Sequence, residues 1–550
     1  MRVVERAYAG AALTAATVFT AGAALLAVTL PYHVWDAFSL GDWSRRIAAG
    51  SWLDPINAGQ LAAARPLFFY LQGAVWSVTG LSFTAGRLLS LAFALLFLVL
   101  VVGCARRLGA PRPVAGIAAL VALAVPALSA EAVAGDTDVP AAAMTALVAW
   151  LALGRRSGYR PAAALAAAAV AALLTKPTTV APLCGLAIWM AIDDSRPLRD
   201  RIRWSLAPLA LGGAVGVGYY AVMAARFHTW LLPFLRTTTS EGLWAQRAAA
   251  ARADAVLSLD VLGGALRLAL AYALVYSVAR AVGARHRRAG LLALPASAVW
   301  AVAGPIAAGE SAISSAWQAF ALVGFAAVAV ASALGDPGDA PGRATLLGLL
   351  AFGGLPLAVW IYTTAYADRL AATSWPGLVL LITVALVPGV RALAQLSLGF
   401  GLVPVTALAA AAWLAVAGLD GLHGHQWIEY RSLGLHGVWN KDRTLNIVLP
   451  QVQEALAAVE PELGARGRLS VWDPRFAYFL PGRVDTTEAL HCSDVRRDAV
   501  LLVLTSDEAV AAARDAAGLA TPEDWSKCRS PRLVPLPAQV DGFAAFRVVS

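Results

Sequence analysis

Apolar segments long enough to cross a lipid bilayer recur through about the first 420 residues of this 550-residue chain. A transmembrane helix needs roughly 20 apolar residues to span the hydrocarbon core. The first segment runs from Ala7 to about Leu30, after the basic start Met1–Arg6. It is longer than the ~7–15 residues of a signal-peptide core, so the sequence predicts an uncleaved first helix with its N-terminus inside.

The later apolar segments extend this pattern to an all-α polytopic membrane protein with about thirteen transmembrane helices. Residues 66–80 are apolar but too short to cross, and they predict a helix lying along the membrane. The further spans are expected at 86–104, 113–129, 139–154, 161–175, 177–192, 204–225, 259–281, 291–308, 316–334, 344–362, 373–390 and 399–418.

Composition agrees with a membrane protein, because 59% of the residues are hydrophobic and only 14% are charged. Soluble domains are roughly half apolar and about a quarter charged. The net charge of +9 raises the question of nucleic acid binding. The basic residues, however, lie in short clusters between apolar segments, as orientation signals do, and no nucleic acid partner is expected.

These basic clusters all fall on one side of the predicted topology, the side of the N-terminus. The opposite, outward side then carries most of the unusual acidic residues. We expect a multi-pass protein of the plasma (inner) membrane whose chemistry lies on the outer face. The outward segments are 31–85, 130–138, 226–258, 309–315, 363–372 and the tail from about 420.

The tail, residues 420–550, differs from the membrane domain (1–419) and predicts a small extracytoplasmic α/β domain. Cys492 and Cys528 lie in this polar tail, where an oxidising exterior would allow a disulfide. No glycine-rich phosphate loop is present in the tail. Helices are expected at 444–462 and 507–518, and strands at 468–472, 499–505, 532–536 and 543–549.

The first outward loop, 31–85, mixes charges with tryptophans, as suits a bilayer–water interface. Asp36 lies just beyond the first membrane helix, and a carboxylate there can act as a general base toward a hydroxyl group. Asp42 is followed by Trp43, Ser44 and two arginines. That context fits a salt-bridged helix start better, so Asp42 is a secondary candidate.

Asp136 and Asp138 end the outward loop at 130–138, directly before a predicted helix that carries Pro140 near its start. Two acids at this spacing can ligate a divalent cation such as Mg²⁺, Mn²⁺ or Ca²⁺, or can cap the helix. A cap needs only one acid. The pair therefore favours a functional site, with Asp138 ahead of Asp136.

Lys176 lies between two apolar segments, where a lysine is costly without an anionic partner. It can snorkel to the interface or bind the phosphate of a polyprenyl lipid. Arg65 and Arg369 are candidates for the same phosphate, because arginine donates two parallel hydrogen bonds. Asp368 and Glu310 are secondary candidates on the outward face, and an ordinary solvated acid is an equal alternative for Glu310.

The order of these features resembles the C-type integral-membrane glycosyltransferases, in particular the lipid A aminoarabinose transferases and the protein O-mannosyltransferases. Asp36 matches the acid that opens the family's first loop, and Asp138 its second-loop aspartate. Pro177 stands where the family usually has glycine. The remaining matches are Arg45–Trp52 with Pro55, Arg65-Pro66-Leu67 for Lys-Pro-Pro-Leu, Arg87-Leu88, Leu174-Thr175-Lys176, and Arg369 with Pro376.

This resemblance implies an enzyme that takes a sugar from a polyprenyl-phosphate donor and gives it to a glycan, lipid or protein acceptor, with inversion. Asp36 would be the base, Asp138 would support it or a bound cation, and Lys176, Arg65 and Arg369 would stabilise the departing phosphate. The alternatives are a transporter or flippase for a lipid-linked or small polar substrate, and a non-catalytic membrane protein. No internal repeat supports a transporter.

Overall fold

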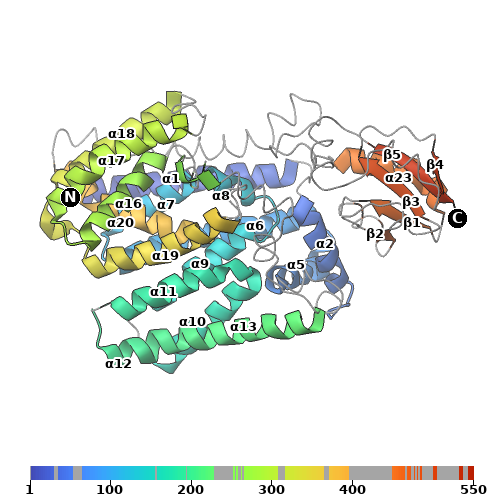
Figure 1. The fold of residues 1–550 in the computed structure, drawn as a ribbon, viewed down its shortest axis with the longest axis horizontal. Coiled ribbons are helices and arrows are strands. Elements are labelled where there is room, and N and C mark those ends of the chain that lie inside the picture. The colour runs from blue at the N-terminus through green and yellow to red at the C-terminus, as the bar shows by residue number, and fades with distance from the viewer. Residues whose placement is uncertain are drawn as a thin grey trace. The chain divides into compact units, whose positions relative to one another are not determined.

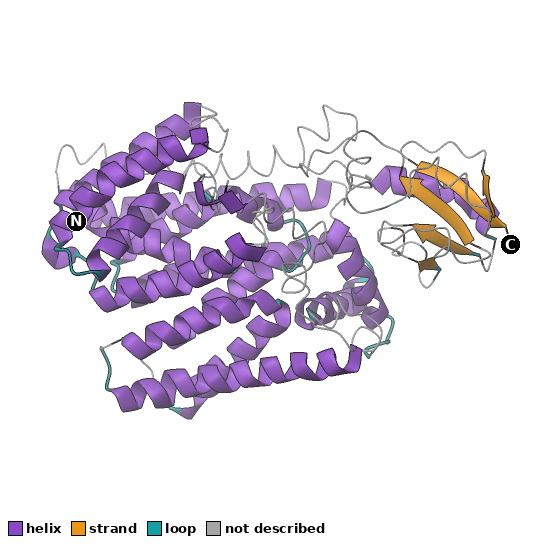
Figure 2. Ribbon diagram, in the orientation of Figure 1, coloured by secondary structure: helices purple, strands orange, loops and turns teal. Residues whose placement is uncertain are grey.

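The computed structural model of this chain is mostly helical (Figures 1 and 2). Its contacts divide the chain into two units. The first unit comprises 1–25, 59–68 and 87–421, and the second 26–58, 69–86 and 422–550. The structure describes residues 2–29, 35–53, 65–154, 158–193, 195–227, 252–253, 255–257, 262, 266–307, 316–363, 371–395, 449–464, 467–471, 476, 480, 483–485, 499–504, 532–536 and 543–549.

The first unit is a bundle of apolar helices. A 3-10 turn at Pro177–Thr179 and a π-helical turn at Ile202–Leu206 join some of its members. Its helices are α1 (Arg2–Thr29), α6 (Phe83–Arg107), α7 (Arg112–Leu123), α8 (Pro126–Glu131), α9 (Asp138–Ala152), α10 (Tyr159–Thr175), α11 (Val180–Ile192), α12 (Leu198–Arg201), α13 (Ala207–Phe227), α16 (Arg267–Ala281), α17 (His286–Ala307), α18 (Ala316–Leu334), α19 (Arg343–Thr363) and α20 (Trp375–Gln395).

The helices identify a membrane protein. Within the described residues, five helices are long and apolar enough to cross a bilayer: Thr84–Arg107, Leu198–Arg226, His286–Ala307, Arg343–Thr363 and Trp375–Ala392. Five shorter apolar helices accompany them. The count of about thirteen spans stays a prediction, since the expected span 399–418 lies outside the described residues.

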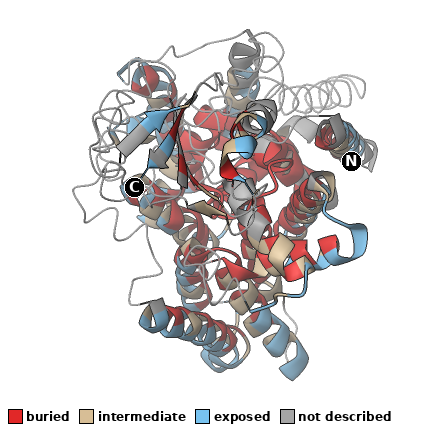
Figure 3. Cartoon of the chain, turned by 90° about the vertical axis from the view of Figure 1, so that its right-hand side faces the viewer, coloured by how far each residue is buried: buried red, intermediate tan, exposed pale blue. Residues whose placement is uncertain are grey.

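Helix α20 forms the centre of this bundle. In its apolar window 89% of the residues are buried inside the protein, against 33% for the span that contains α13. It packs against α7, α16, α18 and α19. Figure 3 shows buried residues concentrated on the inner sides of the helices and exposed residues on their outer sides. The exposed apolar faces suit contact with lipid.

Glycines allow two helix pairs to approach closely. Gly353 on α19 faces Gly377 on α20, and a Cβ at Gly353 would lie 2.8 Å from the Gly377 carbonyl carbon. Gly212 and Gly216 on α13 face α10, where a Cβ at either position would collide with Ala166 or Leu173.

In the second unit, α2 (Trp35–Ala48) packs against α5 (Pro66–Thr79). Ser44 Oγ donates to Gln72 Oε1 at 3.0 Å between buried side chains, and Tyr70 donates its O–H to the Trp52 carbonyl at 2.6 Å. Partial burial raises the pKa of Tyr70 and keeps its hydroxyl protonated. As the sequence predicts, α5 is a helix too short to cross a membrane.

The described part of the tail holds α23 (Leu449–Leu463) and a five-stranded sheet in the order β2-β1-β3-β5-β4. β1 pairs in parallel with β2 and β3, while β5 pairs antiparallel with β3 and β4. Apolar residues of α23 pack on strand residues such as Leu469 and Val500. The strands are β1 (Arg468–Val471), β2 (Val484–Asp485), β3 (Ala499–Leu504), β4 (Arg532–Pro535) and β5 (Phe543–Val549).

The helix expected at 507–518 and the predicted pair Cys492–Cys528 lie outside the described residues. The disulfide therefore stays a prediction, as does the division of the chain at residue 420. Both described cysteines, Cys104 and Cys184, are free.

The packing of α19 on α20 gives a first prediction. Gly353→Ala forces a methyl group against the Gly377 backbone, and we expect it to lower the free energy of unfolding by about 2 kcal/mol. Gly354→Ala is the matched control, because a Cβ at Gly354 meets nothing within 4 Å. Thermal unfolding of the purified protein in detergent measures both variants. Equal melting temperatures for the two variants would contradict this packing.

Candidate functional site

The turn that leads into α9 carries the second predicted pair of acids. Asp136 Oδ1 accepts a hydrogen bond from the backbone N–H of Asp138 at 2.8 Å. Asp136 thus closes an Asx turn just before the helix, whose N-cap residue, Thr137, makes no side-chain capping hydrogen bond. Gly135, with φ of 76°, supplies the left-handed residue that the turn requires. Asp138 is the first residue of α9, and this turn uses only its backbone N–H, so its carboxylate can contact other residues.

Lys176 forms an ion pair with Asp138, 38 residues away in the sequence, and the two side chains are 1% and 2% exposed. Lys176 lies between α10 and the 3-10 turn, with φ of −158° and ψ of 127°. The residue before a proline is driven to this extended conformation. Thr179 fixes the Lys176 carbonyl through its N–H (3.1 Å) and its hydroxyl (2.8 Å). Lys176 is therefore buried inside the protein and paired with Asp138.

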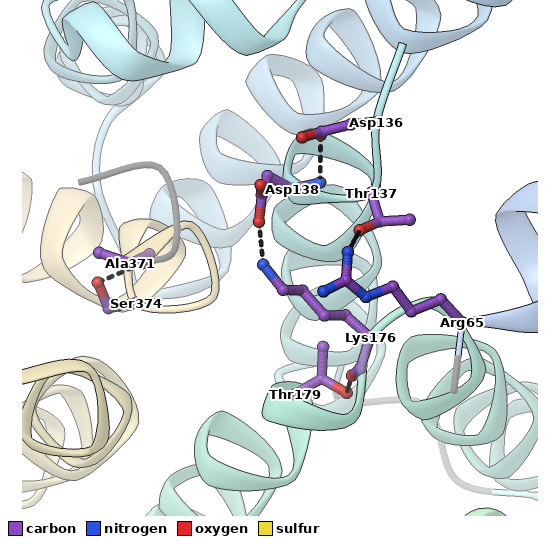
Figure 4. Close-up of polar contacts among 8 residues, drawn as sticks. All are labelled: Arg65, Asp136, Thr137, Asp138, Lys176, Thr179, Ala371 and Ser374. Carbon is purple, nitrogen blue, oxygen red and sulfur yellow. Dashed lines mark hydrogen bonds and ion pairs between the residues drawn. The ribbon is translucent and has the colours of Figure 1, made fainter. Parts of the chain in front are cut away.

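Arg65, which precedes α5 and belongs to the first unit, joins the same cluster. Its Nη1 donates to Thr137 Oγ1 at 3.3 Å, and the side chain is buried. Figure 4 shows Arg65 and Lys176 approaching the 136–138 turn, with Arg65 at Thr137 and Lys176 at Asp138. Residues predicted from three separate parts of the sequence thus converge at one place.

Glu131, at the end of α8, is a site residue that sequence reasoning missed. Glu131, Asp136 and Asp138 are all buried, and each offers a carboxylate oxygen within 4.8 Å of the others. The signal was present, because Glu131 is an acid in the same short outward segment as the two aspartates. Helix α8 ends at Glu131, and the turn that follows brings Asp136 and Asp138 close to its carboxylate.

Three carboxylates are the ligand type that hard cations such as Mg²⁺, Mn²⁺ and Ca²⁺ prefer. The donor set therefore fits the divalent cation that the sequence suggested. Lys176 and Arg65 already place two positive charges beside the three acids. A bound cation would share Asp138 with the Lys176 ammonium group.

Several predicted site residues lie outside what the structure describes. Asp36 and Asp42 belong to α2, but their side chains are not described. Glu310, Asp368 and Arg369 lie outside the described residues. The turn just after Arg369 is described: Ser374 Oγ donates to the Ala371 carbonyl at 2.7 Å. Figure 4 draws this turn beside the Lys176–Asp138 pair, and α20 packs on α9.

The buried ion pair gives a second prediction. Lys176→Met leaves the Asp138 carboxylate buried without its cation, and we expect a loss of about 3 kcal/mol in unfolding free energy. The double variant Lys176→Met with Asp138→Asn contains neither buried charge. Its loss of unfolding free energy should therefore be smaller than the sum of the two single losses. Thermal unfolding in detergent measures the cycle.

The control is the exposed ion pair of Arg547 with Glu462 in the tail. Arg547 is 54% exposed, and surface pairs contribute about 0–1 kcal/mol. Arg547→Met should therefore shift the melting temperature little. Similar losses at the two pairs would argue against a structural role for the buried one.

Residues 63–220, which include Arg65, Glu131, Asp138 and Lys176, match the family model described as dolichyl-phosphate-mannose-protein mannosyltransferase. No curated protein sequence matches the chain.

Among solved structures, the chain is similar to ArnT from Cupriavidus metallidurans in the apo state, with a TM-score of 0.53 and 13% identity over 95% of each chain. It is also similar to ArnT from the same organism bound to undecaprenyl phosphate, with a TM-score of 0.54 and 14% identity over 98% of this chain and 97% of that chain. This likeness shows a shared fold. Together with the family match over 63–220, it confirms the resemblance of this chain to the C-type integral-membrane glycosyltransferases.

Proposed function

We propose that this protein is a membrane glycosyltransferase that moves a sugar from a polyprenyl-phosphate donor to a cell-envelope acceptor on the outer face of the membrane. The observation that carries the proposal is the buried cluster at the start of α9, where Lys176 and Arg65 lie beside the acids of the 131–138 segment. Positive charges held in a water-poor setting suit a lipid-linked phosphate, because their attraction is little screened there.

The comparisons support this choice of donor. One of the similar structures is ArnT bound to undecaprenyl phosphate, and the matching family model is described by a dolichyl-phosphate-linked sugar. A site on the outer face also has no cytoplasmic nucleotide sugar at hand, so its donor must arrive on a lipid. Arg65 and Lys176 both lie within the matched residues 63–220.

The proposed reaction is a single displacement at the anomeric carbon. Asp36 accepts the proton of the acceptor hydroxyl as that oxygen bonds to the anomeric carbon. The bond from that carbon to the phosphate oxygen breaks, and the polyprenyl phosphate leaves with the electron pair. Attack from the opposite face, through an oxocarbenium-like state, inverts the configuration. The sugar is a hexose or a pentose, and the acceptor is a glycan, a lipid or a protein.

Lys176, Arg65 and Arg369 are assigned to the departing phosphate, where preorganised positive charge lowers the barrier most. Asp138 holds the Lys176 ammonium group in position before the donor binds. Glu131, Asp136 and Asp138 would hold a divalent cation. Such a cation, when bound, would add further positive charge to stabilise the phosphate.

A transporter or flippase for a lipid-linked substrate is the second candidate, because buried acid–lysine pairs also occur along transport pathways. The pair lies at helix ends, where Asp138 begins α9 and Lys176 follows α10, and transport sites also use the ends of broken helices. The family match over 63–220, which contains both residues, favours the enzyme.

The assignment of Asp36 gives a third prediction. In a strain lacking this gene, restored Asp36→Asn protein should leave the lipid-linked sugar accumulated and the envelope glycan truncated, because the acceptor proton has no base. We expect transfer to fall about 10²-fold or more, with binding of undecaprenyl phosphate retained. Mass spectrometry of envelope glycans and polyprenyl-phosphate sugars measures the transfer.

Asp200→Asn, an exposed acid between predicted spans on the inner side, is the control and should restore the parent glycan. Full transfer by Asp36→Asn would remove the base assignment. Unaltered glycans in the deletion strain, together with a lost transport activity, would favour the second candidate.

The acidic cluster gives a fourth prediction. If Glu131, Asp136 and Asp138 hold a divalent cation, EDTA should lower sugar transfer, and added Mg²⁺, Mn²⁺ or Ca²⁺ should restore it. Glu131→Gln removes one charged ligand and should raise the cation concentration needed for half-restoration about tenfold or more. Direct binding of the same ions, measured by calorimetry, gives a readout apart from activity. If EDTA does not change transfer, the three acids hold no cation that transfer needs, and their role is only to pair with the cationic side chains.

A further inference from the structure

The end of α10 has a gap in its hydrogen bonding. In an α-helix each carbonyl accepts the N–H of the fourth residue onward. The carbonyl of Leu173 would therefore accept from residue 177. Residue 177 is a proline and has no N–H. Leu173 is 1% exposed, so water does not readily replace the missing donor.

Tyr220 on α13 supplies that donor. Its buried hydroxyl donates a hydrogen bond to the Leu173 carbonyl, 47 residues away in the sequence. The hydroxyl of a side chain on a neighbouring helix thus takes the place of the backbone amide that Pro177 lacks.

The approach of α13 to α10 brings this hydroxyl into reach. Gly212, Gly216 and Tyr220 follow one another at intervals of four residues, so they share one face of α13. The two glycines lie directly against Ala166 and Leu173 of α10, with no room for a Cβ. The next position on that face, Tyr220, then lies at the last turn of α10.

Lys176 depends on this turn. Its N–H donates to the Ala172 carbonyl at 3.2 Å, and its carbonyl is held by Thr179. Tyr220 fixes Leu173, which lies between Ala172 and the extended Lys176. Tyr220 therefore holds the helix turn that leads directly into Lys176.

We propose that Tyr220 is a positioning residue, whose hydroxyl replaces the amide missing at Pro177 and fixes the backbone from which Lys176 reaches Asp138. The inference rests on the proposed function, because Lys176 is assigned there to the donor phosphate. It adds a residue that does not touch the phosphate and that matters because this chain has proline at position 177.

A double-mutant cycle between Tyr220→Phe and Pro177→Ala tests the proposal in the full-length protein. Two readouts are measured for each variant: hydrogen–deuterium exchange of the segment 173–177, and the affinity for undecaprenyl phosphate. Tyr220→Phe should speed exchange about tenfold and weaken binding about tenfold, because the buried Leu173 carbonyl loses its donor. In the Pro177→Ala background an amide is available again, and the same change should have less than about a twofold effect on either readout.

Tyr159→Phe is the matched control. Tyr159 lies at the other end of α10, is 76% exposed, and accepts a hydrogen bond from Arg203, just before α13. The control removes a hydroxyl from an exposed contact between α10 and the turn that precedes α13, and both readouts should stay at the parent value.

The outcomes separate the two proposals. Equal effects of Tyr220→Phe in both backgrounds, or no effect on exchange, would overturn the role of Tyr220 as a substitute for the amide. Faster exchange with unchanged affinity would show that the hydroxyl does not position Lys176 for phosphate, and would overturn the inference as well. A parent protein that does not bind undecaprenyl phosphate would instead count against the proposed function, and the exchange readout would still decide whether Tyr220 replaces the missing amide.

Discussion

The buried ion pair between Lys176 and Asp138 is the interaction on which the arrangement of the site depends. A lysine that is 1% exposed between apolar helices is stable only with an anionic partner and well-made hydrogen bonds. That requirement fixes the start of α9 relative to the end of α10. Because Arg65 reaches the same turn through Thr137, the chain just before α5 is tied to it as well. One electrostatic requirement thus joins three segments that are far apart in sequence.

Charge balance sets a condition on anion binding at this cluster. Three buried carboxylates, Glu131, Asp136 and Asp138, lie beside two cationic side chains, Lys176 and Arg65. With all five groups ionised, the carboxylates outnumber the cations, and an arriving phosphate would compete with Asp138 for Lys176. Within the proposed function, a divalent cation held by the three acids would reverse this excess and make the cluster suited to a phosphate.

The sequence predicted which residues belong to this site better than it predicted the contacts between them. Lys176, Arg65 and Asp138 stand out because charged residues are rare among apolar segments, and the cost of burying them makes them visible in a single sequence. Glu131 was missed because, although it shares a short outward segment with the two aspartates, its own neighbours do not distinguish it from a solvated loop acid. Its meaning appears only when α8 ends and the chain turns back toward α9. Tyr220 was missed for a related reason, since a tyrosine within an apolar helix looks like packing. The fold was predictable as a set of apolar helices, whereas the central place of α20 depends on contacts between distant helices.

Pro177 connects the local chain chemistry to the site. A proline after Lys176 ends α10, extends the lysine backbone and removes one amide from the helix end. The first two effects aim Lys176 at Asp138, while the third leaves the Leu173 carbonyl in need of a donor. Glycine at this position would keep the amide and would permit more backbone conformations. The proline therefore makes the lysine more rigid only if another group satisfies the carbonyl, and the close approach of α13 through Gly212 and Gly216 lets Tyr220 do so. The packing of α13 on α10 and the direction of the Lys176 side chain therefore depend on each other.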